Sequence, residues 1–371
     1  MRRPPRWILA LALALPIVPL SARAQGGAAG SVTIGKIDSI FSPTLKEQRP
    51  YLVYTPPSYS DTTYTKRGYP VLYLLDGDAH FHSVTGLLQI LGTGVNATFV
   101  VPEMIVVAIP NTNRMRDLTP TQAARDFEGK ADTALRMTGG GPKFLNFMRS
   151  ELIPHIDATY RTAPYRVFVG HSLGGLMAFQ ALYTMPEVFN AYVAIDPSLW
   201  WDDRRLLKQA PAFFGKATAP GRTLFVTQAN TLVATDTIDN PHYNSIVRLN
   251  AIVEAGNASG VRYAFRYYPN DSHGSVPLIS EYDALRFIFD GFQPDLFRAL
   301  ESPAYVQEHF AKISRQLGYQ FLPPEGMVDL LAIIEMGRNK AKAVELLKLN
   351  TELYPNSTRA KAALQKASAA K

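Results

Sequence analysis

A serine flanked by glycines is the feature of this sequence that most directly implies chemistry. The motif Gly-His-Ser-Leu-Gly occupies residues 170–174, between a β-prone apolar run at 165–169 and a helix-like run at 176–182. Strand, Gly-x-Ser-x-Gly and helix is the order that a nucleophile elbow requires. A side chain at either glycine would clash in so tight a turn, and the pattern predicts a Ser172 hydroxyl held exposed on strained backbone. The alternative is an ordinary strand-to-helix turn that buries the serine.

A serine hydroxyl is a poor nucleophile at neutral pH and needs a base within hydrogen-bond reach. In a fold with such an elbow, the base follows the last strand. His273 comes soon after the β-prone run at 262–268, and among the seven histidines it alone combines this position with the required chain order. His171, inside the motif, is predicted to line the site.

The third catalytic group is an acid that fixes the imidazole tautomer and stabilises the imidazolium. It must lie between the serine and the histidine in the chain. We favour Asp236, in the loop at 227–244 after the seventh strand, over Asp196, at the end of the strand that follows the elbow, and over Asp239. For each of the three, the alternative is an aspartate that caps a turn or a helix.

Two backbone amides must converge on the oxyanion of the tetrahedral intermediate, and each donor lowers the barrier by roughly 3 kcal/mol. Leu173, directly after the serine, is one candidate. Asp78, in the loop at 76–79 after an apolar strand, is the other. This chemistry requires no cofactor and no metal, and the sequence has no glycine-rich loop of the nucleotide-binding kind.

Apolar runs of strand length alternate with helical patterns along most of the chain. The predicted strands are residues 31–42, 50–55, 69–75, 104–109, 165–169, 191–195, 223–226 and 262–268. The predicted helices are residues 82–91, 142–160, 176–185, 245–255 and 282–292. Such alternation implies right-handed βαβ crossovers after an antiparallel start. We predict an α/β fold with a mostly parallel eight-stranded sheet, helices on both faces, and the site at the carboxyl ends of the strands.

The first 24 residues have the layout of a secretory signal peptide. A basic start is followed by an apolar run at 7–20 and by an Ala-x-Ala cleavage site at 22–24. The apolar run is short for a bilayer span and contains two prolines, which disfavours a membrane anchor. We therefore expect a periplasmic or secreted protein without a membrane span.

Composition excludes several other classes of protein. The formal charge of the 371 residues is +7, but the predicted leader holds four arginines and no acid, which leaves 34 basic and 31 acidic residues in the remainder. No basic stripe with interleaved aromatic residues is present, and this disfavours nucleic-acid binding. The sequence has no cysteine, so disulfides, thiol nucleophiles and zinc–thiolate sites are excluded.

The C-terminal segment, residues 304–371, differs in character from the α/β region at 25–300. A helical run to residue 336, a glycine turn, an amphipathic run at 340–354 and a proline have the layout of about one tetratricopeptide unit. One such unit cannot bury its own apolar face. We expect it to dock on the α/β domain, and the alternative is that it binds a protein partner.

Several sequence strings together resemble the putative-esterase family of α/β-hydrolases, over about residues 31–294. That family includes siderophore esterases, esterase D-like enzymes and, more distantly, mycolyl transferases. The strings are Leu74-Leu75-Asp76-Gly77, Asn111-Thr112-Asn113-Arg114-Met115-Arg116-Asp117-Leu118-Thr119-Pro120, Gly170-His171-Ser172-Leu173-Gly174-Gly175, Pro197-Ser198-Leu199-Trp200-Trp201 and His273-Gly274-Ser275-Val276-Pro277-Leu278.

The resemblance implies that Ser172 is the nucleophile and His273 the base, with the amides of Asp78 and Leu173 as oxyanion donors. It leaves the acid open, because relatives usually have serine where this chain has Asp196.

Further side chains are candidates for substrate contacts. Arg114 and Arg116 are candidates to bind an anionic group, and the alternative is that they order their loop by pairing with Asp117 and Glu128. Trp200 is a candidate wall of the site, and the alternative is core packing of the Trp200–Trp201 pair.

These observations predict a serine carboxylic-ester hydrolase that works through an acyl-enzyme on siderophore-like or other small esters. One alternative is acyl transfer to an alcohol, as in mycolyl transferases. The other is a non-catalytic interaction protein that uses the C-terminal helices on a hydrolase scaffold.

Overall fold

The computed structural model describes residues 31–94, 99–126, 129–232 and 240–369. By its internal contacts the chain separates into a short N-terminal unit, residues 1–33, and a second unit, residues 34–371, to which the rest of this description applies. The predicted leader lies outside the described residues. In the described part of the chain, no helix combines the length and the apolar character needed to cross a membrane.

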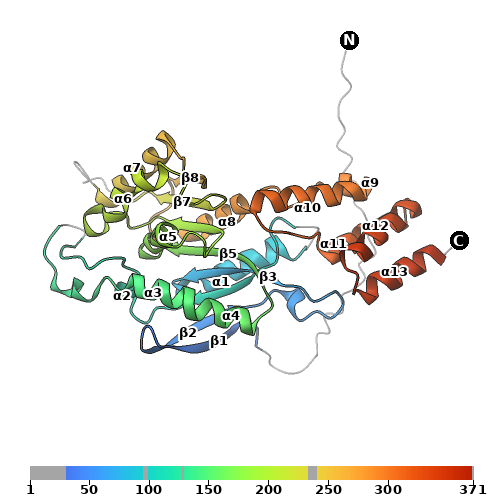
Figure 1. The fold of residues 1–371 in the computed structure, drawn as a ribbon, viewed down its shortest axis with the longest axis horizontal. Coiled ribbons are helices and arrows are strands. Elements are labelled where there is room, and N and C mark those ends of the chain that lie inside the picture. Colours follow the sequence, from blue (N-terminus) through green and yellow to red (C-terminus); the bar gives the residue numbers. More distant parts are fainter. Residues whose placement is uncertain (1–30, 95–98, 127–128, 233–239, 370–371) are drawn as a thin grey trace, which may run out of the picture. The chain divides into compact units, whose positions relative to one another are not determined.

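An eight-stranded sheet forms the centre of the second unit, with the strand order β1-β2-β4-β3-β5-β6-β7-β8 (Figure 1). The strands are β1 (Lys36–Ser42), β2 (Glu47–Tyr54), β3 (Tyr69–Leu75), β4 (Ile105–Ile109), β5 (Thr162–His171), β6 (Ala191–Ile195), β7 (Thr223–Ala229) and β8 (Arg262–Tyr268). β1, β2 and β4 pair antiparallel, and the six strands from β4 to β8 pair parallel. The sheet is therefore mixed, and the expected α/β-hydrolase architecture is confirmed.

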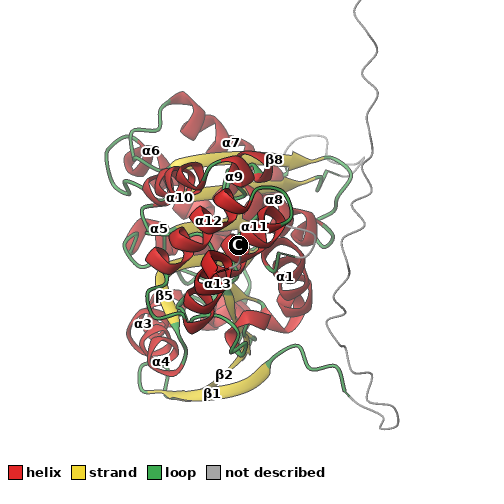
Figure 2. Ribbon diagram, turned by 90° about the vertical axis from the view of Figure 1, so that its right-hand side faces the viewer, coloured by secondary structure: helices red, strands yellow, loops and turns green. Residues whose placement is uncertain are grey.

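Helices cover both faces of this sheet (Figure 2). Those within the α/β region are α1 (Gly77–Gly92), α2 (Arg114–Asp117), α3 (Gly141–Phe147), α4 (Ile153–Thr159), α5 (Leu173–Thr184), α6 (Trp201–Phe214), α7 (Pro241–Ala255) and α8 (Val276–Ile288). A π-helical turn, Met148–Leu152, joins α3 to α4, and short 3-10 helices occur at Pro57–Tyr59 and Thr133–Met137. All five predicted helices are present. α6 was missed because it carries an internal proline, Pro211, and opens with three left-handed residues, Asp202–Arg204.

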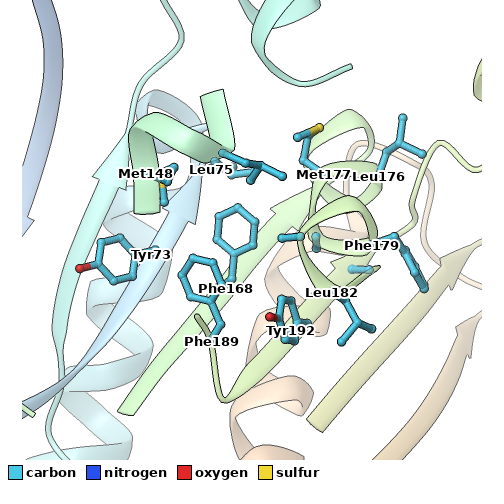
Figure 3. Packing of buried hydrophobic residues seen from close by; sticks show 14 of the residues in the cluster. Tyr73, Leu75, Met148, Phe168, Leu176, Met177, Phe179, Leu182, Phe189 and Tyr192 are labelled. Atoms are coloured by element: carbon cyan, nitrogen blue, oxygen red, sulfur yellow. The ribbon is translucent and has the colours of Figure 1, made fainter. Parts of the chain in front are cut away.

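Two apolar layers, one on each face, hold the sheet in place. Alternate residues of the buried strands divide between them: Tyr73 and Phe168 belong to one cluster, and Leu72 and Val167 to the other. In the first cluster the ring of Phe168 stacks on Phe189, with centroids 4.6 Å apart and an interplanar angle of 10° (Figure 3). Such two-sided burial is why these strands read as continuous apolar runs in the sequence.

The C-terminal helices pack against the α/β region of the same unit. They are α9 (Leu296–Glu301), α10 (Pro303–Leu317), α11 (Glu325–Met336), α12 (Lys340–Leu353) and α13 (Thr358–Ala369). The Glu325 carboxylate accepts a 2.7 Å hydrogen bond from the amide of Thr65, between β2 and β3, and Tyr64 contacts Asp329. These contacts support docking, the alternative that we favoured for this segment.

The turn from β5 into α5 depends on a glycine that admits no side chain. A Cβ atom at Gly170 would lie closer to the backbone of Gly174 than real Cβ atoms come. We expect Gly170→Ala to lower the free energy of unfolding by about 1–3 kcal/mol, as overpacking does. Urea denaturation measures this effect.

The matched control is Gly86→Ala, inside α1, where an added Cβ meets nothing within 4 Å. That substitution is expected to stabilise the protein by up to about 1 kcal/mol, because alanine is the better helix former. Equal stability of the Gly170→Ala and Gly86→Ala proteins would contradict the tight-turn account.

Candidate active site

Ser172 sits at the sharp turn between β5 and α5. Its φ of 60° and ψ of −114° are uncommon for a residue with a side chain. Two backbone hydrogen bonds hold it there: its amide donates to Ile195 O at 2.9 Å, and its carbonyl accepts from Ser198 at 3.0 Å. The side chain is partly exposed, and its Oγ lies 3.2 Å from Oγ of Ser198. The local geometry is that of the predicted nucleophile elbow.

His273 lies in the loop between β8 and α8, at the carboxyl end of the last strand. Its ring packs against that of His171, the neighbour of Ser172, with centroids 4.5 Å apart. Its Nδ1 lies 2.6 Å from Oδ2 of Asp196, and 41% of its side chain is exposed. The structure thus brings the predicted base to the elbow and gives it a buried carboxylate partner.

That carboxylate is Asp196, the second choice from sequence. Asp236, which the sequence favoured, and Asp239 lie outside the described residues. Asp196 directly follows β6 with a φ of 39°, and its side chain is fully buried. Its Oδ1 accepts a 2.9 Å hydrogen bond from the amide of Ala229, the last residue of β7.

A second imidazole, which sequence reasoning missed, reaches the same carboxylate. His242, in the first turn of α7, places Nε2 at 3.0 Å from Oδ2 of Asp196 and is buried. The signal that could have found it is the Asn240-Pro241 pair before it, an N-cap followed by proline at the first helical position. The helix that starts there lies beside the end of β7, because Nε2 of Gln228 donates a 3.0 Å hydrogen bond to Tyr243 O.

Hydrogen bonding fixes the charge and the proton positions of this cluster. Burial alone would raise the pKa of Asp196, but the hydrogen bonds from His242 and His273 outweigh it and hold that pKa below its usual range. A carboxylate only accepts hydrogen bonds, so both rings donate to it. His273 then carries its proton on Nδ1, and its Nε2 is free to accept a proton.

The two predicted oxyanion donors lie at the starts of two helices. Asp78 is in the first turn of α1, directly after β3, and Leu173 begins α5, directly after β5. The first amides of a helix have no acceptor within it, and the helix dipole favours negative charge there. Because β3 and β5 are neighbouring parallel strands, both helix starts lie at the same edge of the sheet.

Arg114 links the two turns that supply these amides. Its guanidinium makes two hydrogen bonds to Asp76, from Nε at 2.7 Å and Nη2 at 2.9 Å, and Nη2 lies 3.2 Å from His171 O. Burial of Asp76 opposes its ionisation, but the bonds from Arg114 keep its pKa below the usual value. These contacts support a structural role for Arg114, with Asp76 as its partner. Asp117 pairs with Arg116, as expected for this pair of arginines, and Glu128 lies outside the described residues.

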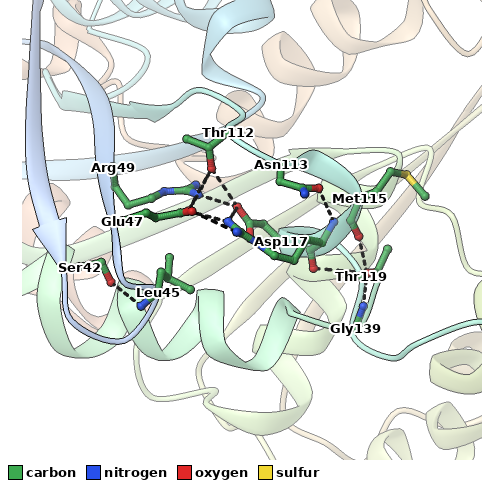
Figure 4. A network of polar contacts seen from close by, with 11 residues as sticks. Ser42, Leu45, Glu47, Arg49, Thr112, Asn113, Met115, Asp117, Thr119 and Gly139 are labelled. Carbon is green, nitrogen blue, oxygen red and sulfur yellow. Dashed lines mark hydrogen bonds and ion pairs between the residues drawn. The ribbon is translucent and has the colours of Figure 1, made fainter. Parts of the chain in front are cut away.

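A buried ionic network anchors the segment that carries Arg114 (Figure 4). Arg49, almost completely buried, lies 2.6 Å from Asp117 and 2.8 Å from Glu47. Arg116 also pairs with both of these acids, and its hydrogen bond is the main cause that lowers the pKa of Glu47 to about 2. The network joins β2 to α2, which begins at Arg114.

The other two predicted lining residues differ in their surroundings. His171 lies between the rings of His80 and His273, and burial together with nearby His273 lowers its pKa to about 3, so it is neutral. Trp200 is partly buried and packs against Trp201, with ring centroids 5.7 Å apart. Trp201 is the core member of the pair and donates from Nε1 to Thr121 O at 3.1 Å.

Comparison with known proteins agrees with this geometry. The family model described as putative esterase matches residues 42–241, more than half of the chain. The chain belongs to this esterase family. It is therefore a carboxylic-ester hydrolase on an α/β-hydrolase fold.

Individual relatives extend the likeness. The chain is 29% identical over 287 residues to the ferri-bacillibactin esterase BesA of Bacillus subtilis, which covers 74% of this chain and 96% of BesA. It is 31% identical over 172 residues to a siderophore triacetylfusarinine C esterase of Aspergillus fumigatus, which covers 44% of this chain and 56% of the relative.

A solved structure matches over a longer stretch. The IroE-like serine hydrolase of Shewanella oneidensis superposes with a TM-score of 0.71 at 29% identity, over 90% of this chain and 99% of that one. That share is larger than residues 31–300 alone would make up, so the likeness extends into the C-terminal helices.

A buried carboxyl group contacts His80, the histidine whose ring packs against His171. Glu281, on α8, is 3% exposed, and burial raises its pKa to about 8. Its Oε1 lies 3.6 Å from Nδ1 of His80, whose pKa burial lowers. Near neutral pH both groups are therefore mostly uncharged, and their contact is not an ion pair.

This raised pKa predicts a pH-dependent stability. Between pH 4.5 and about 8 the folded esterase keeps the Glu281 proton while the unfolded chain loses it, so this group lowers stability as pH rises. Glu281→Gln removes the effect, and the variant should gain stability over wild type by at most about 1.4 kcal/mol per pH unit across that window. Urea denaturation at pH 5, 6, 7 and 8 measures the difference.

Glu308→Gln, at an exposed position on α10, is the control. Its free energy of unfolding should depend on pH in the same way as that of wild type. A Glu281→Gln curve that also runs parallel would show that Glu281 ionises normally in the folded esterase.

Proposed function

We propose that Ser172, His273 and Asp196 form the catalytic triad of this ester hydrolase. The observation that carries the proposal is the 2.6 Å hydrogen bond between His273 and the buried Asp196, made beside a serine on an elbow turn. The chain order Ser, Asp, His is that of α/β-hydrolases. Asp196 replaces Asp236, our first choice from sequence, in this assignment.

The reaction follows from the proton positions. Ser172 Oγ attacks the ester carbonyl carbon while His273 Nε2 takes the hydroxyl proton, and Asp196 stabilises the imidazolium through Nδ1. The negative oxygen of the tetrahedral intermediate accepts hydrogen bonds from the amides of Asp78 and Leu173. When the intermediate collapses, His273 returns the proton to the leaving alkoxide, and an alcohol departs from the acyl-enzyme.

Water completes the cycle by the same steps. His273 takes a proton from the attacking water, a second tetrahedral intermediate forms in the same oxyanion hole, and its collapse frees the carboxylic acid and the Ser172 hydroxyl. Burial lowers the pKa of His171 to about 3, so this ring is too weak a base to compete with His273 for the proton.

The substrate class is proposed from the relatives. Two of them are named esterases of bacillibactin and of triacetylfusarinine C, both of them siderophores. We extend siderophore-like esters to this chain as substrates, together with simpler esters that a partly exposed serine accepts. The leader-like residues 1–24 support a periplasmic or secreted location.

The nucleophile is tested by Ser172→Ala. Loss of the attacking oxygen is expected to lower kcat/KM on p-nitrophenyl butyrate by at least about 10³-fold, and to abolish labelling by a fluorophosphonate. Labelling is located by mass spectrometry of the tryptic peptides. Ser150→Ala, at an exposed serine, is the control. A fluorophosphonate adduct on any other residue would reject Ser172.

The acid is tested by a pair of variants, Asp196→Asn and Asp236→Asn. The first leaves His273 without a carboxylate at Nδ1 and should lower kcat by roughly 10²–10⁴-fold with a folded protein, and the second should change kcat by less than about 3-fold. Steady-state kinetics with circular dichroism on each variant decides between them. The reverse order of effects would make Asp236 the acid.

A further inference from the structure

We infer that Asp196, His242 and His273 form a binding site for one divalent transition-metal ion, with Zn²⁺ as its probe, and that the bound ion switches the esterase off. The binding half of this inference rests on the geometry of three side chains. The inhibitory half rests on the proposed role of His273 as the base.

The three donor atoms already converge. One possible ligand atom from each of Asp196, His242 and His273 lies within 4.8 Å of those of the other two. The contacts to Oδ2 of Asp196 are made by Nε2 of His242 and Nδ1 of His273. The oxygen is 3.0 Å from the first nitrogen and 2.6 Å from the second. Tetrahedral Zn²⁺ with ligands at about 2.0–2.2 Å separates its donors by roughly 3.4 Å, so the rings must shift only modestly to admit it.

The site is closed on one side and open on the other. Asp196 is fully buried and His242 nearly so, whereas 41% of the His273 side chain is exposed. An ion can therefore enter past the His273 ring, and that ring has the freedom to adjust. Solvent then reaches the fourth coordination position, as it does in three-ligand zinc sites.

The donor types select the metal. Two imidazoles and one carboxylate suit Zn²⁺ and other late first-row cations, whereas Mg²⁺ and Ca²⁺ prefer a shell of oxygen atoms. The carboxylate of Asp196 also brings one negative charge to the site.

His242 is the residue that the triad alone does not explain. A Ser–His–Asp triad needs one imidazole hydrogen-bonded to the carboxylate. In this chain a second, buried imidazole is hydrogen-bonded to the same oxygen. Because of His242, three possible metal ligands come together at this carboxylate, where the triad alone would supply two.

Occupancy of the site changes the tautomer of the base. A metal ion takes the lone pairs of Nδ1 of His273 and of Nε2 of His242. The proton that each of these nitrogens gives up moves to the other nitrogen of its own ring, which is Nε2 in His273 and Nδ1 in His242. Both rings remain neutral and no proton is lost from either. Nε2 of His273 then carries a proton and cannot accept the one from Ser172, so attack on the ester stops while the site itself stays intact.

Isothermal titration of Zn²⁺ into the full-length protein tests binding separately from activity. We expect one high-affinity ion per chain in wild type and in Ser172→Ala, which keeps all three ligands. His242→Gln retains a hydrogen-bond donor for Asp196 but loses the ligand nitrogen, and its affinity should fall by at least about 10-fold. His82→Gln, at an exposed histidine, should bind as wild type does.

Esterase rates, each relative to the same variant without metal, test the inhibition. Wild-type activity should fall as Zn²⁺ occupancy rises, return on addition of EDTA, and be unaffected by Mg²⁺. His242→Gln should need at least about 10-fold more Zn²⁺ for the same fractional loss. If that variant fails to fold by circular dichroism, His273→Gln, at the more exposed ligand, replaces it in the titration.

The outcomes separate the two proposals. Equal Zn²⁺ affinity in wild type and His242→Gln overturns the metal site, even if Ser172→Ala confirms the esterase mechanism. Binding that depends on His242 without any loss of activity overturns the inhibitory half and the role of His273 as base, and leaves the metal site standing.

Discussion

A single buried carboxylate organises this active site. Asp196 stands at the carboxyl end of β6 and receives donors from three other elements: the end of β7 through Ala229, the start of α7 through His242, and the loop after β8 through His273. A buried charge is costly unless its hydrogen bonds are made. The same bonds that compensate for its burial therefore fix the position and the tautomer of His273, the proposed base, and they join three successive βα units at one carboxylate.

The two turns that carry the proposed oxyanion donors are also joined by a single side chain. Arg114 holds the Asp76 turn, which leads into α1, and the carbonyl of His171, which leads into α5. Both proposed oxyanion donors therefore belong to turns fastened by one guanidinium, whose own segment is anchored by the Arg49 network. Such pre-arranged donors stabilise developing charge without reorganising at the moment of reaction.

The strands, most helices and the position of Ser172 could be predicted from the sequence better than the side-chain contacts of the site. Strands buried on both faces are visible as apolar runs, and the elbow motif located Ser172, because these depend on residue types that lie close together in the chain. The acid was harder, since chain order allows Asp236, Asp196 and Asp239, and we favoured Asp236. The contact of Asp196 with His273 joins residues 77 positions apart in the chain. The contacts of His242 and Arg114 join segments that lie far apart in the chain, and only the start of the helix that carries His242 has a local signal, the Asn240-Pro241 pair.

The docking of the C-terminal helices constrains the order in which contacts form as this chain folds. The amide of Thr65, in the loop that precedes β3, donates a hydrogen bond to Glu325, 260 residues further along the chain. β3 lies in the middle of the sheet and leads directly into the Asp76 turn. Contacts of such long separation form late, because the loop that they close costs entropy first. A chain emerging from the ribosome thus lacks this contact next to its central strand until residue 325 has been synthesised.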